Sequence, residues 1–235
     1  MGTLYIVATP IGNLEDCSIR SIRVLFSSDA IASEDTRRTG ALLQELRKRF
    51  PEHVPSGEPA LIRYDDRTEL SQTAEIVALL ESGKQISLVT DAGTPLISDP
   101  GYVLVKEARK RSIPVHAIPG PSAVVAALSV SGLPVDKFLF LGYPPEKQSH
   151  RIKQFETIQT IMEGPIGPTA VWYVAPHKLE QTLLDMKSVF GAIDISLARE
   201  LTKVYEDSWT GSLDAALKRH EEFKGELVLM IHLSR

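Results

Sequence analysis

The densest set of chemically useful residues lies at positions 91–101, where two Asp, two Gly and two Pro occur within eleven residues. An apolar run precedes them at 86–90 and predicts a buried strand, and residues 102–111 predict a helix. In an open α/β sheet, such a strand-to-helix turn lies at the carboxyl end of a strand, where ligands bind. Gly lets the backbone approach a ligand, and Pro fixes the shape of the loop beforehand. Asp91 then offers an acceptor to a ligand hydroxyl or amine, although an ordinary turn with a capping Asp remains the alternative.

Three other loops follow predicted strands in the same way, at positions 9–16, 33–37 and 119–123. In a parallel sheet these loops emerge at one edge, so all four are expected to converge on one ligand. No G-x-G-x-x-G loop follows the first strand and no Walker A sequence occurs. This argues against an ordinary dinucleotide site and against a P-loop NTPase.

Each loop also has a structural interpretation. Ser122 stands at a predicted helix start, where it either caps the helix or marks a backbone turn that meets a ligand carboxylate or amide. Glu34, Asp35 and Arg37 bring two carboxylates and a guanidinium together, as a solvated polar turn would also do. In the second half of the chain, residues 173–177 and 199–203 form the corresponding loops.

Composition limits the remaining possibilities. The 235 residues are 43% hydrophobic and 24% charged, with a formal net charge of −4. This length supports one large or two small domains. Cys17 is the single cysteine, which excludes an internal disulfide and a cysteine metal cluster, and no metal site is expected. No apolar run approaches the roughly 20 residues of a membrane span, and no signal-peptide pattern follows Met1, so a cytoplasmic protein without membrane contact is expected.

Apolar strands alternate with amphipathic helices in the first half, which predicts a mainly parallel sheet. We expect Leu70, Ala74, Val77 and Leu80 to form the buried face of the third helix. The expected strands are 4–8, 30–32, 60–64, 86–90 and 114–118, and the expected helices are 18–28, 39–50, 69–82, 102–111 and 122–131.

The rhythm changes near residue 119. The expected strands are then 138–142, 169–174, 193–199, 207–210 and 226–233, and the expected helices are 148–163, 178–190 and 212–220. Two strands separated by a short loop, 193–199 and 207–210, indicate antiparallel pairing. The sequence therefore predicts two α/β domains, residues 1–118 with a mainly parallel sheet and residues 119–235 with a mixed sheet.

Taken together and in order, these motifs resemble the ribosomal RNA small subunit methyltransferase I family, within the tetrapyrrole-methylase (class III methyltransferase) superfamily. The resemblance covers nearly the whole chain. It is carried by residues 7–16, 34–37, 91–101, 119–123, 131–134, 138–142, 175–177, 199–203 and 225–226.

The resemblance implies two tetrapyrrole-methylase-type α/β domains with S-adenosylmethionine in the cleft between them, in a homodimer. It implies 2'-O-methylation of a cytidine in the decoding region of 16S rRNA, in the small ribosomal subunit. By position, the cofactor contacts would come from Pro10, Asp91, Thr94, Ser122, Ala123, Tyr173 and Leu201.

A ribose hydroxyl becomes a good nucleophile only when it loses its proton, so a nearby base is expected. Glu34 or Asp35 is the candidate acceptor of that proton. Arg37 or Lys203 is the candidate that holds a phosphate or stabilises the developing alkoxide. All four could instead form structural ion pairs.

The chain departs from the family pattern at several positions. Val174 and Lys178 replace a Glu and an Arg, residues 64–67 read Tyr-Asp-Asp-Arg in place of Tyr-His-Glu-His, and segment 47–59 is longer than usual. The chain stops at Arg235, where family members usually carry a further small domain. Two other functions therefore stay open: a methyltransferase that acts on a tetrapyrrole-like small molecule, and a non-catalytic dimer that binds S-adenosylmethionine.

Overall fold

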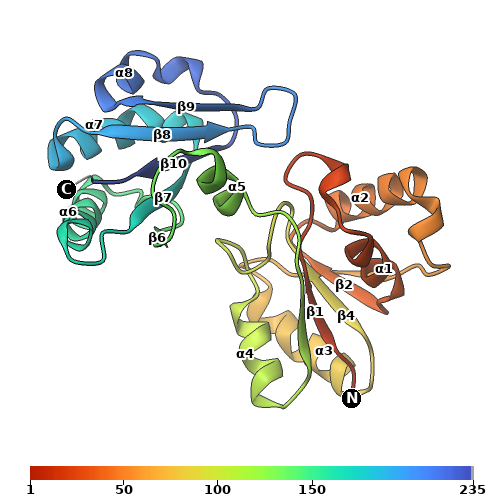
Figure 1. Cartoon of the computed structure of the whole chain (residues 1–235). Helices are drawn as coiled ribbons and strands as arrows, with labels where there is room; N and C mark the ends of the chain where they lie inside the picture. The colour runs from red at the N-terminus through yellow and green to blue at the C-terminus, as the bar shows by residue number, and fades with distance from the viewer. Residues whose placement is uncertain (234–235) are drawn as a thin grey trace. The chain divides into compact units, whose positions relative to one another are not determined.

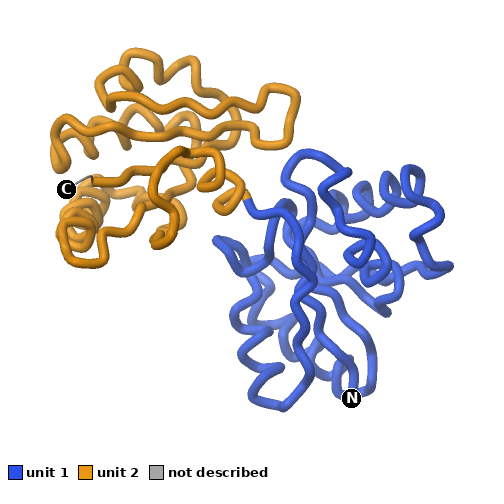
Figure 2. Tube along the Cα trace, viewed as in Figure 1, with its two compact units in different colours: residues 1–122 blue, residues 123–235 orange. Residues whose placement is uncertain are grey.

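The computed structural model describes residues 1–233. The chain folds into two compact units, residues 1–122 and the part from Ala123 onward (Figure 2). In residues 1–233, no helix has both the length and the apolar character needed to cross a membrane.

The first unit is built on an all-parallel sheet, as predicted (Figure 1). Its strand order is β3-β2-β4-β1-β5, so β4 lies between β2 and β1. The strands are β1 (Leu4–Val7), β2 (Ala30–Ser33), β3 (Ala60–Arg63), β4 (Ile86–Val89) and β5 (Val115–Ile118).

Helices cover both faces of this sheet. On one face α1 (Ile19–Ser27) and α2 (Thr36–Arg49) share a core with Val7, Ile31 and Val89 of the strands. On the other face, α3 (Glu69–Glu81) and α4 (Tyr102–Lys110) pack on the strand residues that alternate with those of the first face. The loops after β1 and β2 thus lead to one face of the sheet, and the loop after β4 leads to the other. Because β4 lies between β2 and β1, its loop separates from both neighbouring loops at the carboxyl end of the strands. Short 3-10 turns, η1 (Leu14–Asp16) and η2 (Pro51–His53), complete this unit.

Two details of the predicted helices were wrong. The second helix begins at Thr36, not at residue 39, because the Asp35 carboxylate accepts a hydrogen bond from the Arg37 N–H (2.9 Å) and so caps it. The buried face of α3 contains Thr73, Ile76, Val77 and Leu80. Leu70, which is 79% exposed, and Ala74, which is also exposed, do not belong to it. A hydrophobic pattern does not place Thr73 inside, but its hydroxyl is paired with the buried Tyr64 hydroxyl (3.0 Å).

The second unit is built on a mixed sheet of order β6-β7-β10-β8-β9. Only the β6–β7 pair is parallel, and β8 and β9 form the predicted antiparallel pair. The strands are β6 (Phe138–Phe140), β7 (Thr169–Val174), β8 (Asp194–Arg199), β9 (Asp207–Ser212) and β10 (Leu227–Ile231).

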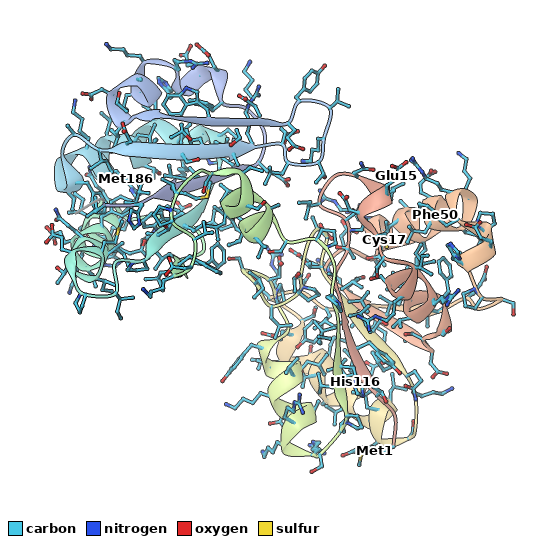
Figure 3. All side chains as sticks on the ribbon, viewed as in Figure 1. Met1, Glu15, Cys17, Phe50, His116 and Met186 are labelled. Carbon is cyan, nitrogen blue, oxygen red and sulfur yellow. The ribbon has the colours of Figure 1, made fainter. Side chains whose placement is uncertain are left out.

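One face of this sheet carries α6 (Gln148–Glu163), α7 (Leu179–Phe190) and α8 (Leu213–Lys218), which enclose a core around Trp172 and Met186 (Figure 3). The predicted helix 178–190 starts at Leu179, because residues before it form the 3-10 turn η3 (Pro176–Lys178). A second 3-10 turn, η4 (His220–Glu222), follows α8. Helix α5 (Ala123–Val130) contacts β10.

A buried ion pair joins α6 to α7. Arg151 is 5% exposed and Asp185 is 3% exposed, and the Arg151 Nε donates to Asp185 Oδ2 (2.7 Å). The Pro145 carbonyl accepts from Arg151 Nη1, and Gln148 donates to Asp185 Oδ1. The pair is thus surrounded by hydrogen bonds, which a buried pair needs in order to offset its loss of solvation.

Asp185→Ala should lower the unfolding free energy of the second unit by about 3–5 kcal/mol, because it leaves Arg151 buried without a counter-charge. Asp214→Ala is the matched control, since the Lys187–Asp214 pair (2.6 Å) is about half exposed, and its loss should cost less than about 1 kcal/mol. Urea unfolding followed by tryptophan fluorescence measures both, because both tryptophans, Trp172 and Trp209, lie in this unit. Equal losses in the two variants would contradict the prediction.

Candidate functional site

The loops after β1 and β4 are bonded to each other. Thr9 and Gly93 exchange two backbone hydrogen bonds (2.9 and 3.1 Å), and the buried Thr9 hydroxyl donates to the Thr90 carbonyl (3.1 Å). Gly93 has φ +87°, a conformation that favours glycine. Pro10 follows Thr9 and is half-buried. The two loops therefore form one rigid platform at the carboxyl edge of the sheet.

The loop after β5 joins the same platform. The Thr94 hydroxyl donates to the Pro121 carbonyl (3.1 Å). A Cβ on Gly120 would lie 3.0 Å from the Ala8 Cβ, so glycine permits this close approach. Ser122 ends this loop directly before α5, whose first residue is Ala123. The strand order thus brings Pro10, Asp91, Thr94 and Ser122 to one edge.

Asp91 is only half satisfied at this edge. Its Oδ2 accepts from Arg38 Nη1 (2.8 Å), whereas its Oδ1 is buried and has no hydrogen-bond partner in residues 1–233. An unpaired buried acceptor costs about 1–3 kcal/mol, so it marks a place where a ligand donor would be favourable. The hydroxyls of Ser33 and Thr90 are likewise buried without partners, at the ends of β2 and β4.

The loop at 91–101 is held in a strained shape. Leu96 (φ +73°) and Ser98 (φ +68°) lie in the left-handed region, where a non-glycine residue costs about 1–3 kcal/mol. Gly101 has φ +137°, and a Cβ there would lie 2.7 Å from Leu88. The Glu69 carboxylate accepts from the Gly101 N–H (2.9 Å) and so anchors the end of the loop to α3.

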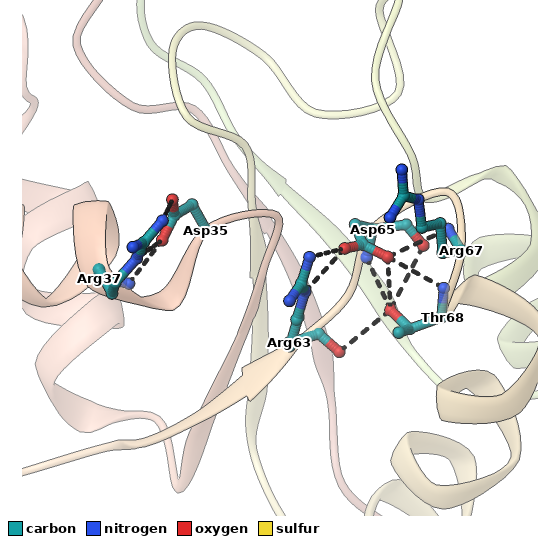
Figure 4. Close-up of polar contacts among 6 residues, drawn as sticks. All are labelled: Asp35, Arg37, Arg63, Asp65, Arg67 and Thr68. Atoms are coloured by element: carbon teal, nitrogen blue, oxygen red, sulfur yellow. Dashed lines mark hydrogen bonds and ion pairs between the residues drawn. The ribbon is translucent and has the colours of Figure 1, made fainter.

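Of the two candidate bases, Asp35 is the one that is already occupied. It caps α2 and accepts from both Nε (3.2 Å) and Nη2 (3.0 Å) of Arg37, whose side chain is 90% exposed (Figure 4). These bonds to Arg37 lower the pKa of Asp35 to about 2. A carboxylate so weakly basic is a poor acceptor for a hydroxyl proton.

Glu34 has the opposite environment. Burial raises its pKa, and the carboxylates of Asp91 and Asp66 raise it further. Asp99 behaves in the same way: burial, followed by the charges of Glu34, Asp91 and Asp66, raises its pKa to about 6. The sequence does not single out Asp99, because burial and charges from loops after three different strands together raise its pKa.

The loop after β3 carries the departures at 64–67. Tyr64 is buried beneath it, and Asp65 accepts from the Arg63 Nε (2.7 Å) and from the backbone N–H groups of Arg67 and Thr68 (Figure 4). Asp65 therefore organises the turn, while Asp66 and Arg67 remain exposed.

In the second unit, Tyr173 lies near the end of β7 within an aromatic group. Its ring is 4.9 Å from that of Phe140 and 5.6 Å from that of Tyr143, measured between centroids. Leu201 follows β8 and is 8% exposed. Tyr173 is thus part of an aromatic group near the end of β7, and Leu201 is buried.

Lys203 is held by two carboxylates. Its Nζ lies 2.8 Å from Glu226 and 3.2 Å from Glu200. Burial lowers the pKa of Lys203, but the two carboxylates outweigh this effect and raise it overall. Glu200 also accepts from the Glu226 N–H (2.9 Å) and packs on Gly225, where a Cβ would lie 2.2 Å from its Oε1. The motifs at 199–203 and 225–226 thus form one ionic cluster.

Residues 1–233 contain no group of three or more His, Cys, Asp or Glu side chains placed to hold a metal ion. Cys17 belongs to the segment between β1 and α1 (Figure 3), and burial raises the pKa of its thiol to about 11. A thiol with this pKa stays protonated and unreactive at neutral pH.

Comparison with known proteins identifies the family. The family model of the tetrapyrrole (corrin/porphyrin) methylases matches residues 3–217. Proteins named ribosomal RNA small subunit methyltransferase I are similar over nearly the whole chain. One from Halalkalibacterium halodurans is 41% identical over 98% of this chain and 75% of its own length. One from Thermotoga maritima is 37% identical over 98% of both chains.

The chain belongs to the ribosomal RNA small subunit methyltransferase I family of the tetrapyrrole methylases. Solved structures agree at the level of fold. The methyltransferase CobJ superposes with a TM-score of 0.69 at 16% identity, over 99% of this chain and 95% of its own. Diphthine synthase gives 0.70 at 14% identity, over 98% and 90%. The prediction of two tetrapyrrole-methylase-type α/β domains is therefore confirmed, and family membership makes the chain a methyltransferase.

Proposed function

We propose that this methyltransferase transfers a methyl group from S-adenosylmethionine to the 2'-hydroxyl of a cytidine in 16S rRNA of the small ribosomal subunit. The observation that carries the proposal is the half-satisfied Asp91 on the platform at the end of β4, in a chain whose relatives bear the rRNA methyltransferase name. A cytoplasmic location follows from that substrate.

The residues of the platform fit this cofactor. Asp91 Oδ1 is a buried acceptor that lacks a donor, and S-adenosylmethionine carries hydroxyl and amine donors. Pro10, Thr94 and Ser122 come from the three loops that are bonded together around it. By family resemblance, Ala123, Tyr173 and Leu201 complete the cofactor contacts. The cofactor supplies an electrophilic methyl group, so the protein has to supply position and electrostatics.

Glu34 is the better candidate for the proton acceptor. Its pKa is raised towards the working range of a base, whereas Arg37 holds the pKa of Asp35 low. Arg37 keeps one guanidinium nitrogen outside its bonds to Asp35 and is 90% exposed, so it can contact an RNA phosphate. Lys203 would act from within its carboxylate cluster, chiefly by fixing the loop that carries Leu201.

Labelled S-adenosylmethionine and undermethylated small ribosomal subunits provide the direct test. We expect label in 16S rRNA, on a ribose whose 3' phosphodiester resists alkali, because a 2'-O-methyl group blocks the attack that cleaves RNA. Free 16S rRNA and a porphyrin precursor should be tested in parallel. Label on the porphyrin precursor alone would support a small-molecule methyltransferase, and cofactor binding without transfer to any substrate would support a non-catalytic module.

Asp91→Ala should weaken S-adenosylmethionine binding by roughly tenfold or more, the loss expected for a buried hydrogen bond of about 1–3 kcal/mol. Asp29→Ala is the matched control. Asp29 pairs with Lys84 (2.8 Å) and precedes β2 at the opposite edge of the sheet, so its removal should leave affinity unchanged. Calorimetry measures both variants, and unchanged affinity in a folded Asp91→Ala protein would remove Asp91 from the site.

We also propose a homodimer, on family resemblance. Sedimentation at micromolar protein should give about twice the chain mass of 25.9 kDa. A monomeric species both with and without cofactor would rule this assembly out.

A further inference from the structure

Asp99 lies in the part of the platform where the backbone is strained, and neither the cofactor contacts nor the candidate bases include it. The two left-handed residues Leu96 and Ser98 precede it, and Pro100 follows it. Proline restricts the residue before it to extended backbone, so Asp99 is fixed from both sides. Its side chain is half-buried.

Carboxylates from three loops surround Asp99. Glu34 follows β2, Asp66 follows β3, and Asp91 belongs to the same loop as Asp99. Arg38 of α2 is the cation that acts on Glu34, but its guanidinium is bonded to Asp91 Oδ2 (2.8 Å). Arg38 therefore does not neutralise the negative charge near Asp99, and the charge of Glu34 raises the pKa of Asp99 after the larger effect of burial.

A buried hydroxyl without a hydrogen-bond partner lies near both of these carboxyl groups. Thr90 is 4% exposed, and its Oγ1 is close enough to Glu34 and to Asp99 to lower the pKa of each. It nevertheless makes no hydrogen bond in good geometry with any group in residues 1–233. The neighbouring Ser33 Oγ is fully buried and also unpaired. Buried hydroxyls are normally satisfied, so an unpaired Thr90 hydroxyl near two carboxyl groups indicates a place for a ligand hydroxyl.

We propose that Asp99 and Glu34 form a carboxyl pair that takes up and shares the proton of the acceptor hydroxyl, beside the Thr90 hydroxyl. This inference rests on the proposed function and adds Asp99 to its proton acceptor. As the hydroxyl oxygen forms its bond to the methyl carbon, the carbon–sulfur bond breaks and its electron pair stays on sulfur. The hydroxyl proton passes to the pair, where it relieves the repulsion between two carboxylates, and later leaves to solvent.

The free enzyme provides a first test that needs no substrate. Asp99 has a pKa of about 6 in the folded protein, above the usual value of 3.8, so its ionisation disfavours the folded state as the pH rises through this interval. Asp99→Asn should therefore unfold at a higher urea concentration than the parent at pH 7.5, with the gain fading towards pH 4. Carboxyl NMR titration of this variant should also show a lower pKa for Glu34, because a neighbouring charge is gone.

Single-turnover methyl transfer to small ribosomal subunits provides the second test. In the parent, the rate should rise with pH and level off above about pH 6 to 7, as the pair loses its proton. Glu34→Gln should lower the plateau by about 10²–10⁴-fold, the usual contribution of a general base. Asp99→Asn should lower it about tenfold and move the rising limb about one pH unit down, because Glu34 becomes less basic.

Asp66→Asn is the matched control, since it removes one carboxylate from the same surroundings at an exposed position. It should keep the plateau and move the limb less than Asp99→Asn does. A parent that methylates RNA, together with an Asp99→Asn profile that matches the parent in plateau and limb, overturns the pair and leaves the proposed function intact. A parent that labels no RNA overturns both.

Discussion

The pairing of Thr9 with Gly93 is the contact on which the candidate site depends. These two backbone hydrogen bonds join the loop that follows β1 to the loop that follows β4, although the two loops lead to opposite faces of the sheet. The loops after β1 and β4 turn towards opposite faces of the sheet, which separates them at its carboxyl edge. The Thr9–Gly93 hydrogen bonds limit this separation. Asp91 is thereby held with one oxygen bonded to Arg38 and the other without a donor.

The carboxylates at this edge of the sheet are unfavourable for the stability of the fold, but their repulsion makes a carboxyl group more basic. Burial and the charges of Asp66 and Asp91 raise the pKa of Glu34 and of Asp99, and a fold selected for stability alone would separate or neutralise these carboxylates. Elsewhere the chain does so: Arg151 and Asp185 are fully paired, and Lys203 is held by two carboxylates. The strained residues Leu96 and Ser98 lie in the same loop as Asp91 and Asp99. The stability of the surrounding core offsets this loss of free energy, as is expected at a functional site.

The features of the fold that depend on local residue patterns were predicted from the sequence. Strand–helix alternation indicated the parallel sheet, and the α7 face of Leu179, Leu183, Met186 and Phe190 is buried as its spacing predicts. Local pattern carries no signal where a distant partner decides whether a residue is buried. Thr73 is buried because Tyr64 bonds it, and Arg151 is buried because Asp185, 34 residues away, neutralises it. Glu34 and Asp35 are equal candidate bases in the sequence, and they are separated by the bonds of Arg37 to Asp35 and by the burial of Glu34.

The same reasoning explains why Asp99 is visible in the structure but not in the sequence. A strand-end position made Asp91 a candidate, whereas Asp99 lies eight residues further along, in a loop whose shape the sequence does not give. Its pKa is raised first by burial and then by the charges of Glu34, Asp91 and Asp66, and Glu34 and Asp66 follow β2 and β3, which lie on one side of β4 in the sheet. A base assembled from separate loops can be adjusted by any one of them. The loop after β3 contributes Asp66 to these charges, so this loop can modify the basicity of the pair without touching the cofactor platform.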